Sequence, residues 1–523
     1  ADQTDSYNVA YTFTPTVTNP DSVTITYSIS SGSLPAGITL NTSTGVLSGT
    51  PTDQTTTTYA NIKIRLAYGT AAVIDSNAFS FVVTAAASKS ALGVNLAEMV
   101  DYGTQFAFKD MIKQGRTWTP SSGSLTLDAQ GYPTSLATGQ SARMYWITSI
   151  PNSGTTYTAT HSGQGTFTEV FQGATQMFWD LTSTVTGDNL RNIKMLIPGT
   201  SDPTGTQPFY QPFLDSLAGF GILRFMDWDS TNVNKIVNWS DRTTTDHYTF
   251  TGGTSVTLNV HGQQNTVPYE YMIQLCNALS ADMWVCVPAA ASDDFITQLA
   301  TLIFNNLNPS LKCYYELSNE VWNGSFYGNQ YFLSEAVRQG LGNQFANIMQ
   351  AFSRRCVQMY NLVDAVYGVN TSRRKRVMGA QAASTGTITT PMAFENAYQK
   401  VDYVAVAPYL LLNLPANATA TDITTHIYAA NDGYALNVSN VNACKAAAAS
   451  FGAQLAFYEF GPGFPNSAGD PNTTAYLNYS ISAAMETAMK DYLKAVWQTA
   501  GGSFPACWYN AVAPASQFDW VLA

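Results

Sequence analysis

From residue 91 onward, short apolar runs alternate with segments of helical character, and this alternation constrains the fold more than any other feature of the chain. Eight runs have the length and composition of buried strands: residues 92–96, 221–226, 283–288, 313–317, 376–380, 403–407, 455–458 and 506–509. Alternating strands and helices are typical of parallel α/β folds, because a crossover helix returns the chain to the same end of the sheet. The pattern predicts a (β/α)8 barrel, the TIM barrel fold.

Helical periodicity is clearest in two of the intervening segments. In residues 271–279 four apolar side chains share one helical face, and in residues 345–366 apolar side chains recur every three or four positions. Both spacings fit the period of an amphipathic helix. Only fourteen residues follow the eighth run, too few for a full helix and its loop. We therefore expect the last barrel helix to be truncated or absent.

Residues 1–86 are different in character, with Thr, Val and Ser in alternating patterns, turns rich in Pro and Gly, and no helical period. This composition predicts a small β-sandwich. Within it, Ser-Leu-Pro-Ala-Gly-Ile-Thr-Leu-Asn-Thr-Ser-Thr-Gly-Val-Leu-Ser-Gly-Thr-Pro-Thr at residues 33–52 resembles the immunoglobulin-like modules of bacterial surface and secreted proteins. The resemblance implies a spacer. Residues 84–90 then form a short linker.

The interval between the first and second barrel runs is too long for a loop. It contains β-type pieces at residues 124–127, 156–160, 165–171 and 192–197, broken by Gly, Pro and Asn. A structureless loop of that length inside a barrel would be unusual. We therefore expect a β-rich domain at residues 114–201, inserted between barrel segments 91–113 and 202–523.

The charge of the chain indicates which classes of binding partner are disfavoured. Net charge is −11, with only 11% charged residues and few Lys or Arg, which disfavours binding to nucleic acid and to anionic membranes. No apolar stretch approaches the roughly 18 to 20 residues of a membrane-spanning helix, and the chain begins with a polar segment. We expect a processed, secreted or cell-surface monomer with a neutral partner.

Six cysteines, Cys276, Cys286, Cys313, Cys356, Cys444 and Cys507, lack the spacing of a metal site and stand among apolar neighbours. We expect buried free thiols, with one or two disulfides as the alternative in an exported protein. We expect no metal and no cofactor. The chain also has no Gly-rich phosphate loop, no zinc-type His pair and no Gly-x-Ser-x-Gly motif.

Two carboxylates stand at the ends of predicted strands. Glu320 follows the fourth run in Tyr-Tyr-Glu-Leu-Ser-Asn-Glu-Val-Trp, and Glu459 ends the seventh in Leu-Ala-Phe-Tyr-Glu-Phe-Gly-Pro. In an eightfold barrel these ends surround the active site. Paired carboxylates there indicate cleavage of a glycosidic bond, in which one acid protonates the leaving oxygen and the other attacks the sugar or activates water.

These two peptides resemble the retaining glycoside hydrolases of clan A, and the resemblance covers most of residues 91–523. It implies that Glu320 is the general acid/base and Glu459 the nucleophile. It implies that Asn319 binds the sugar 2-hydroxyl. The same motifs resemble a branch of bacterial secreted enzymes that carry a β insertion.

Further positions match the clan pattern one by one. By that resemblance Arg224 lies near Glu459 and keeps it ionised, and Tyr409 donates its hydroxyl to the same carboxylate. Trp508 on the eighth run would form the aromatic floor for a sugar ring. Trp228, Trp239 and Trp322 stand at or just after strand ends, where indole rings can stack on sugars, although some must belong to the core.

Other polar residues have structural alternatives. Glu316 shares a strand face with the catalytic region, and we interpret it as a buried partner of Arg224. His261 could line the sugar cleft or make a structural hydrogen bond. Asp293 and Asp294 fit the start of a helix better than a sugar site. The basic run at residues 373–376 is interpreted as a solvated edge.

The sequence therefore predicts a retaining endo-β-glycosidase acting on a neutral β-linked polysaccharide or oligosaccharide. Cellulose or another β-glucan is the first expectation, followed by mannan or xylan. The alternative is a carbohydrate-binding or surface-adhesion protein that keeps the barrel without turnover. A purely structural surface protein would leave Asn319, Glu320 and Glu459 unexplained.

Overall fold

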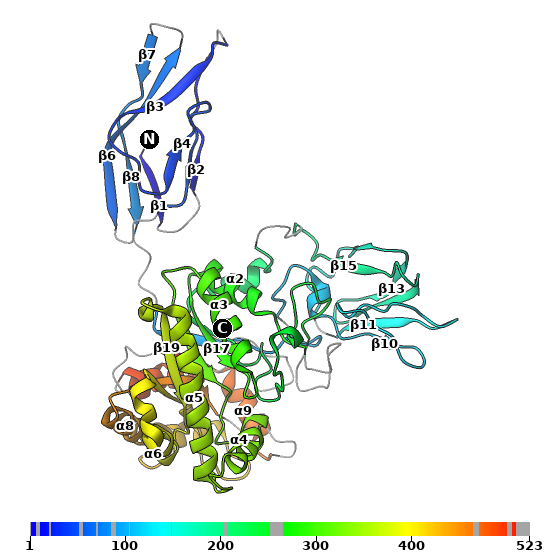
Figure 1. Ribbon diagram of the computed structural model, residues 1–523, viewed down its shortest axis with the longest axis vertical. Helices are drawn as coiled ribbons and strands as arrows, with labels where there is room; N and C mark the ends of the chain where they lie inside the picture. The colour runs from blue at the N-terminus through cyan, green and yellow to red at the C-terminus, as the bar shows by residue number, and fades with distance from the viewer. Residues whose placement is uncertain are drawn as a thin grey trace. The chain divides into compact units, whose positions relative to one another are not determined.

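The chain forms two units, Ala1–Lys89 and Ser90–Ala523. The computed structural model describes residues 2–6, 11–19, 22–51, 56–68, 72–84, 90–103, 105–147, 149–201, 207–251, 265–463, 470–498 and 505–508. Figure 1 shows the first unit in blue and the second from cyan to red. Each unit is described by itself.

The first unit is a β-sandwich. One sheet has the order β1-β8-β6-β3, with β7 paired to β6, and a second sheet has the order β2-β5-β4. The strands are β1 Gln3–Ser6, β2 Tyr11–Phe13, β3 Ile25–Ser31, β4 Ile38–Leu40, β5 Leu47–Gly49, β6 Thr57–Tyr68, β7 Ala72–Asp75 and β8 Phe79–Thr84. Side chains from both sheets, among them Leu47, Ile62 and Phe81, form one buried core. The all-β prediction for this segment is confirmed.

The second unit contains a closed barrel of eight parallel strands. They are β9 Leu92–Asn95, β16 Ile222–Arg224, β17 Asp282–Val287, β18 Cys313–Leu317, β19 Arg374–Gly379, β20 Tyr403–Val406, β22 Gln454–Pro462 and β23 Ala506–Trp508. Consecutive strands of this set pair in parallel, and the short additional strand β21 Tyr409–Leu410 pairs in parallel with the end of β22. The pairing of β23 with β9 closes the ring. Each strand overlaps one of the eight predicted runs.

Helices separate most of these strands, and the two predicted from periodicity are present as α2 and α5. The α-helices are α1 Gln211–Leu217, α2 Tyr269–Leu279, α3 Asp293–Asn306, α4 Tyr327–Arg338, α5 Phe345–Tyr367, α6 Gly386–Ala393, α7 Ala420–Ile427, α8 Gly433–Ser450, α9 Thr473–Ser480 and α10 Ala483–Tyr492. Short 3-10 segments are η1 Met111–Gln114, η2 Trp239–Asp241, η3 Thr371–Arg373 and η4 Phe394–Lys400, and η5 Leu493–Gln498 is a π-helix. The expectation about the last barrel helix concerns residues 510–523, which lie outside the described residues.

A β-rich segment lies between β9 and β16, as expected. Its strands are β10 Thr119–Pro120, β11 Ala142–Trp146, β12 Ala159–Ser162, β13 Gly165–Gln172, β14 Met177–Thr184 and β15 Arg191–Met195. They form a four-stranded sheet of order β10-β11-β14-β13 and a β12-β15 pair; Figure 1 labels β10, β11, β13 and β15 of this segment. We call residues 114–201 the inserted segment, and these boundaries stay a proposal.

The inserted segment has a hydrophobic core of its own. Trp146 and Trp179 are buried there with Met144, Met177 and Leu181. Three of the four expected β pieces overlap strands, whereas residues 124–127 form only one isolated bridge, between Leu127 and Pro133. The central strands β11 and β14 were not predicted.

Three smaller predictions, about the cysteines, the Asp293–Asp294 pair and the basic run, can be compared with the structure. All six cysteines are buried and free. Asp293 and Asp294 form the first turn of α3, which Ser292 caps. The solvated-edge interpretation of residues 373–376 is wrong for Arg374 and Arg376, whose side chains are mostly buried and pair with Asp364 and Asp402. No helix among the described residues is long and apolar enough to cross a membrane.

Candidate active site

A strained turn at the end of β18 presents two of the predicted site residues. Ser318 and Glu320 have φ values of 60° and 44°, in the left-handed region that non-glycine residues seldom adopt. Gly328 packs against this turn, since a Cβ there would lie 2.4 Å from Ser318 Oγ. Such backbone strain is concentrated at functional sites, and here it sets Asn319 and Glu320 at the mouth of the barrel.

Arg224, at the end of β16, connects the predicted residues. Its Nη1 donates to Glu459 Oε1 and to Asn95 Oδ1, both at 2.9 Å. Its Nη2 donates to Asn319 Oδ1 at 2.9 Å, and its Nε donates to Glu316 Oε2 at 3.0 Å. The guanidinium is fully buried, so these carboxylates and amides satisfy a cation that water cannot reach. The structure therefore brings Arg224, Asn319 and Glu459 together.

Glu316 supports the guanidinium from inside the barrel. Besides Arg224, its Oε2 accepts a hydrogen bond from Trp284 Nε1 at 2.8 Å. A Cβ on Gly379 would come within 3.2 Å of Glu316 Oε1, so the carboxylate is closely packed on that side as well. Enclosed in this way, Glu316 has no path to a substrate, which agrees with the structural interpretation.

Glu459 has two kinds of donor. Arg224 contacts Oε1, and the hydroxyl of Tyr409, on β21, donates to Oε2. The side chain is almost completely buried. A guanidinium and a phenol both favour the ionised form of a carboxyl group. The predicted contacts of Arg224 and Tyr409 with Glu459 are present.

Glu320 has neutral donors instead. Tyr458 donates its hydroxyl to Oε1 at 2.9 Å, and Asn323 donates Nδ2 to Oε2 at 3.0 Å. Tyr458 adjoins Glu459 in β22, and the pairing of β22 with β23 is irregular between Phe457 and Phe460. A bulge changes the direction in which neighbouring side chains point. This irregularity explains how two consecutive residues both reach the site.

The different partners determine which carboxyl group carries the charge. Burial raises the pKa of both Glu320 and Glu459 above the ordinary value of a glutamate. Two anions at close range repel each other, so the pair loses its protons in two steps. Because Arg224 and Tyr409 stabilise the ionised form of Glu459, we assign the first charge to Glu459 and the remaining proton to Glu320.

The predicted aromatic residues differ in how far they are buried and in what they pack against. Trp228 is wrong as a substrate contact: it is 2% exposed and stacks on Phe213 and Phe108 in the core, so a sugar cannot reach its face. Trp239 lies against Tyr269, with the Arg242 guanidinium 3.9 Å from its ring centre. Trp322 is half-buried against the core.

Two other predicted residues cannot be placed in the site. Trp508 lies on β23, beside β9 and β22, but its side chain is not among those described. His261 lies outside the described residues. Among the described residues, no three His, Cys, Asp or Glu side chains are grouped as metal ligands would be.

Sequence reasoning missed four polar residues of the site. Asn95 ends β9 and contacts Arg224, Asn232 accepts a hydrogen bond from Asn319 Nδ2 at 3.0 Å, and Tyr458 and Asn323 contact Glu320. Asn95 was detectable as a polar residue ending a buried run. Asn323 and Tyr458 stand within the two motifs that contain the acids.

Comparisons with known proteins agree with the division of the chain. Residues 1–91 match the family model He_PIG, described as "Putative Ig domain". This match, together with the two sheets, confirms the immunoglobulin-like module. The search of curated proteins found no match.

Several solved structures are similar to this chain, all with low sequence identity. A 4-O-α-L-rhamnosyl-β-D-glucuronidase from Fusarium oxysporum 12S is 14% identical over 55% of this chain and 54% of its own, with a TM-score of 0.36. The catalytic domain of a GH26 endo-β-1,4-mannanase from Bacillus sp. JAMB-750 is 12% identical over 62% and 76%, with a TM-score of 0.33. A GH5-4 broad specificity endoglucanase from Clostridium longisporum is 14% identical over 58% and 77%, with a TM-score of 0.34.

The match with the Fusarium enzyme spans about half the length of that protein. All three proteins are glycoside hydrolases by name. The barrel of this chain is established independently of them, by the pairing of its eight strands.

Proposed function

We propose that this protein is a retaining β-glycosidase that cleaves within a neutral β-linked polysaccharide. The observation that carries the proposal is the unequal environment of two neighbouring acids at the barrel mouth. Glu459 contacts a buried guanidinium and a phenol, whereas Glu320 contacts a phenol and an amide. A double displacement needs this difference, with one carboxylate ionised and one carboxyl protonated.

In the first step, Glu459 attacks the anomeric carbon while the bond to the leaving oxygen breaks. Glu320 gives its proton to that oxygen, so the leaving chain departs as an alcohol. The product is a glycosyl ester of Glu459, and Glu320 is now ionised. The Arg224 guanidinium, which balanced the charge of Glu459, remains in place during the attack.

In the second step, Glu320 accepts a proton from water as the water oxygen attacks the anomeric carbon. The ester bond to Glu459 breaks, and the carboxylate is restored beside Arg224 and Tyr409. Two inversions give net retention. We assign to Asn319, which both Arg224 and Asn232 hold in place, the binding of the sugar 2-hydroxyl.

The substrate class is inferred from the low charge of the chain. A protein with 11% charged residues and a net charge of −11 is better matched to an uncharged glycan than to a polyanion. Cellulose or another β-glucan is our first choice, and mannan or xylan the second. The immunoglobulin-like module supports a secreted or cell-surface location, and we propose a monomer.

The test is incubation with purified cellulose, mixed-linkage glucan, mannan and xylan, followed by NMR of the first products. We expect the β-anomer of internal fragments from one of the glucans, and no product from Glu459→Gln. An α-anomer as first product would contradict the retaining mechanism. Binding without turnover on all four polysaccharides would favour the carbohydrate-binding alternative.

A further inference from the structure

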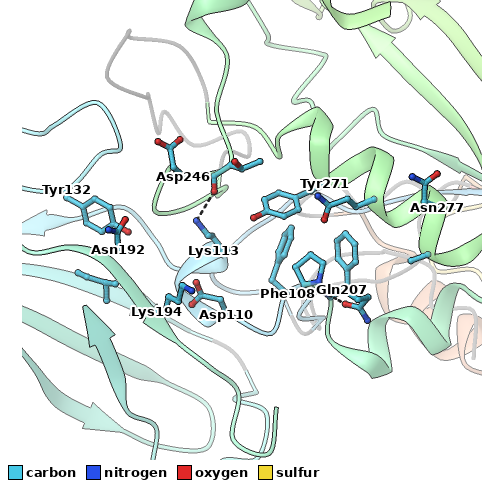
Figure 2. A pocket seen from close by; sticks show the side chains of 16 residues that line it. Phe108, Asp110, Lys113, Tyr132, Asn192, Lys194, Gln207, Asp246, Tyr271 and Asn277 are labelled. Atoms are coloured by element: carbon cyan, nitrogen blue, oxygen red, sulfur yellow. Dashed lines mark hydrogen bonds between the residues drawn. The ribbon is translucent and has the colours of Figure 1, made fainter. Parts of the chain in front are cut away.

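A second cavity lies away from the paired acids, between the inserted segment and α2. Its volume is about 870 Å³, within the roughly 300–1,000 Å³ range of small-molecule sites. Figure 2 shows Tyr132 and Asn192 on one side and Tyr271 and Asn277 on the other. Its lining contains none of the residues assigned above to the candidate active site.

The cavity wall carries charges of both signs in equal number, from Lys113, Lys194, Asp110 and Asp246. Lys113 Nζ donates to the His247 carbonyl at 2.6 Å and to the Thr245 carbonyl at 3.4 Å. An ammonium group has three donors, so one is not used by these two carbonyls, and Nζ also lies 4.8 Å from the ring centre of Phe250. A wall of balanced charge selects against strongly anionic and strongly cationic ligands.

Asp110 supplies an acceptor close to this ammonium group. Its Oδ1 accepts hydrogen bonds from the backbone amides of Ile112 at 3.2 Å and Met195 at 3.0 Å. Both bonds go to one oxygen, which leaves Oδ2 for a ligand. A hydroxyl group both donates and accepts, and so matches a wall that offers a donor and an acceptor side by side.

On the other wall Tyr271 offers an aromatic ring, and the buried rings of Phe108 and Phe209 pack against it. The ring centre of Phe108 lies 5.2 Å from that of Tyr271 and 5.4 Å from that of Phe209. Tyr271 is half-buried, so part of its ring is accessible. An accessible aromatic ring beside polar groups suits a ligand with apolar C–H faces and a rim of hydroxyls.

We propose that this cavity binds a neutral oligosaccharide, as a carbohydrate site separate from the catalytic one. The choice of glycan rests on the proposed function, whereas the preference for a polyol rests on the cavity alone. Bound there, a chain would be held beside the barrel while another segment enters the active site. Two sites on one molecule raise the effective concentration of substrate.

A matched pair of substitutions tests this proposal. Ala278 lies on α2 and lines the cavity, whereas Ala446 is exposed on α8 and does not. We would place Ala278→Trp and Ala446→Trp in the full chain carrying Glu320→Gln, and titrate each with cellohexaose, mannohexaose and xylohexaose by calorimetry. Ala278→Trp fills the cavity, so we expect one binding site to be lost or weakened at least about tenfold. Ala446→Trp should bind as the parent does.

The outcomes separate this proposal from the proposed function. If Ala278→Trp loses one binding site, the proposal that the cavity binds an oligosaccharide is supported, even if the unsubstituted protein hydrolyses none of the glycans. If the unsubstituted protein hydrolyses a glycan and Ala278→Trp keeps the same number and affinity of binding sites, the cavity proposal is wrong and the proposed enzymatic function stands. If none of the three hexaoses binds, the proposed carbohydrate site in the cavity is also wrong. Should Ala278→Trp unfold at a lower temperature, Gln274→Trp, at an exposed position of the same wall, replaces it.

Discussion

At the scale of single residues, Arg224 organises the candidate site. One guanidinium on β16 contacts Asn95 on β9, Glu316 on β18 and Glu459 on β22, together with Asn319 just beyond β18. Two carboxylates contact this buried cation. The cation therefore stabilises the ionised form of a carboxylate that water does not reach. The roles of Glu320 and Glu459 follow from what each one contacts within this arrangement.

The roles of the two acids can be separated by substrate. Glu320→Ala should reduce turnover of a natural glycan by about 10²–10⁴-fold, because the leaving alcohol is no longer protonated. The aryl group of an aryl glycoside departs as a phenolate without protonation, so the first step should be retained. Azide should rescue the second step, because it attacks the glycosyl ester without a general base. Glu459→Ala removes the atom that forms the ester, so the activated substrate should not help it. Steady-state kinetics and product analysis check this, and rescue of Glu459→Ala with retention would reverse the assignment.

The two tyrosines should shift opposite limbs of the pH profile. Tyr458→Phe removes a donor to ionised Glu320 and should raise its pKa, moving the alkaline limb of kcat/KM to higher pH by about 0.5–1 unit. Tyr409→Phe removes a donor to Glu459 and should move the acidic limb to higher pH. Each variant is the control for the other. A shift of the same limb in both would contradict our distribution of the charge.

At the scale of elements, an ion-pair network fixes the opposite end of the barrel. Arg374 and Arg376 on β19 contact Asp364 on α5 and Asp402, which directly precedes β20. Asp402 also accepts a hydrogen bond from the Arg376 backbone amide at 2.8 Å. Residues at this end of a barrel strand serve stability rather than chemistry. The network therefore joins two strands and a helix far from the substrate.

This network should make stability depend on pH. Although burial disfavours its charge, the bonds from Arg376 hold the pKa of Asp402 below the ordinary value. The contribution of Asp402 to the free energy of unfolding is fully present above about pH 3.9, the pKa of an aspartate in the unfolded chain. It is lost as the pH falls through the lower pKa of Asp402 in the folded protein. We expect Asp402→Asn to reduce the free energy of unfolding by about 1–3 kcal/mol at pH 7 and by less at pH 3. Urea denaturation at both values checks this, with exposed Glu169→Gln as the control, and an equal loss at both would contradict it.

The elements also show what the sequence can predict. Barrel strands are buried on all sides, so their apolar runs marked all eight. The ends of two of these runs, together with the motifs around them, marked Glu320 and Glu459 as candidates. Tyr458 was missed because its contact with Glu320 depends on an irregularity in β22 that no local pattern indicates. Trp228 was misplaced because closeness to a strand end does not tell which way a ring turns.

At the scale of the whole molecule, the chain combines a β-sandwich with an enlarged barrel. The candidate acids, their partners and the second cavity all lie in Ser90–Ala523. The first unit has its own core, formed by its two sheets. The separation of cores indicates that the barrel unit folds without the sandwich.

Removal of residues 1–89 should therefore leave catalysis intact. We expect kcat/KM on soluble oligosaccharides to change by less than about twofold, because the first unit supplies none of the candidate site residues. Circular dichroism and thermal unfolding would verify that the shortened protein is folded. A large loss of turnover in a folded protein would show that the sandwich contributes to the site.

Strand β9 has one further consequence, which concerns the order of synthesis. Its two neighbours in the barrel, β16 and β23, are both distant in the chain, the first beyond the inserted segment and the second at Ala506–Trp508. A ribosome must release more than a hundred residues before β9 gains one partner, and more than four hundred before it gains the other. Until β16 is synthesised both edges of β9 are exposed, and until β23 is synthesised one edge stays exposed. A nascent chain paused late in translation presents that edge to chaperones or to other nascent chains.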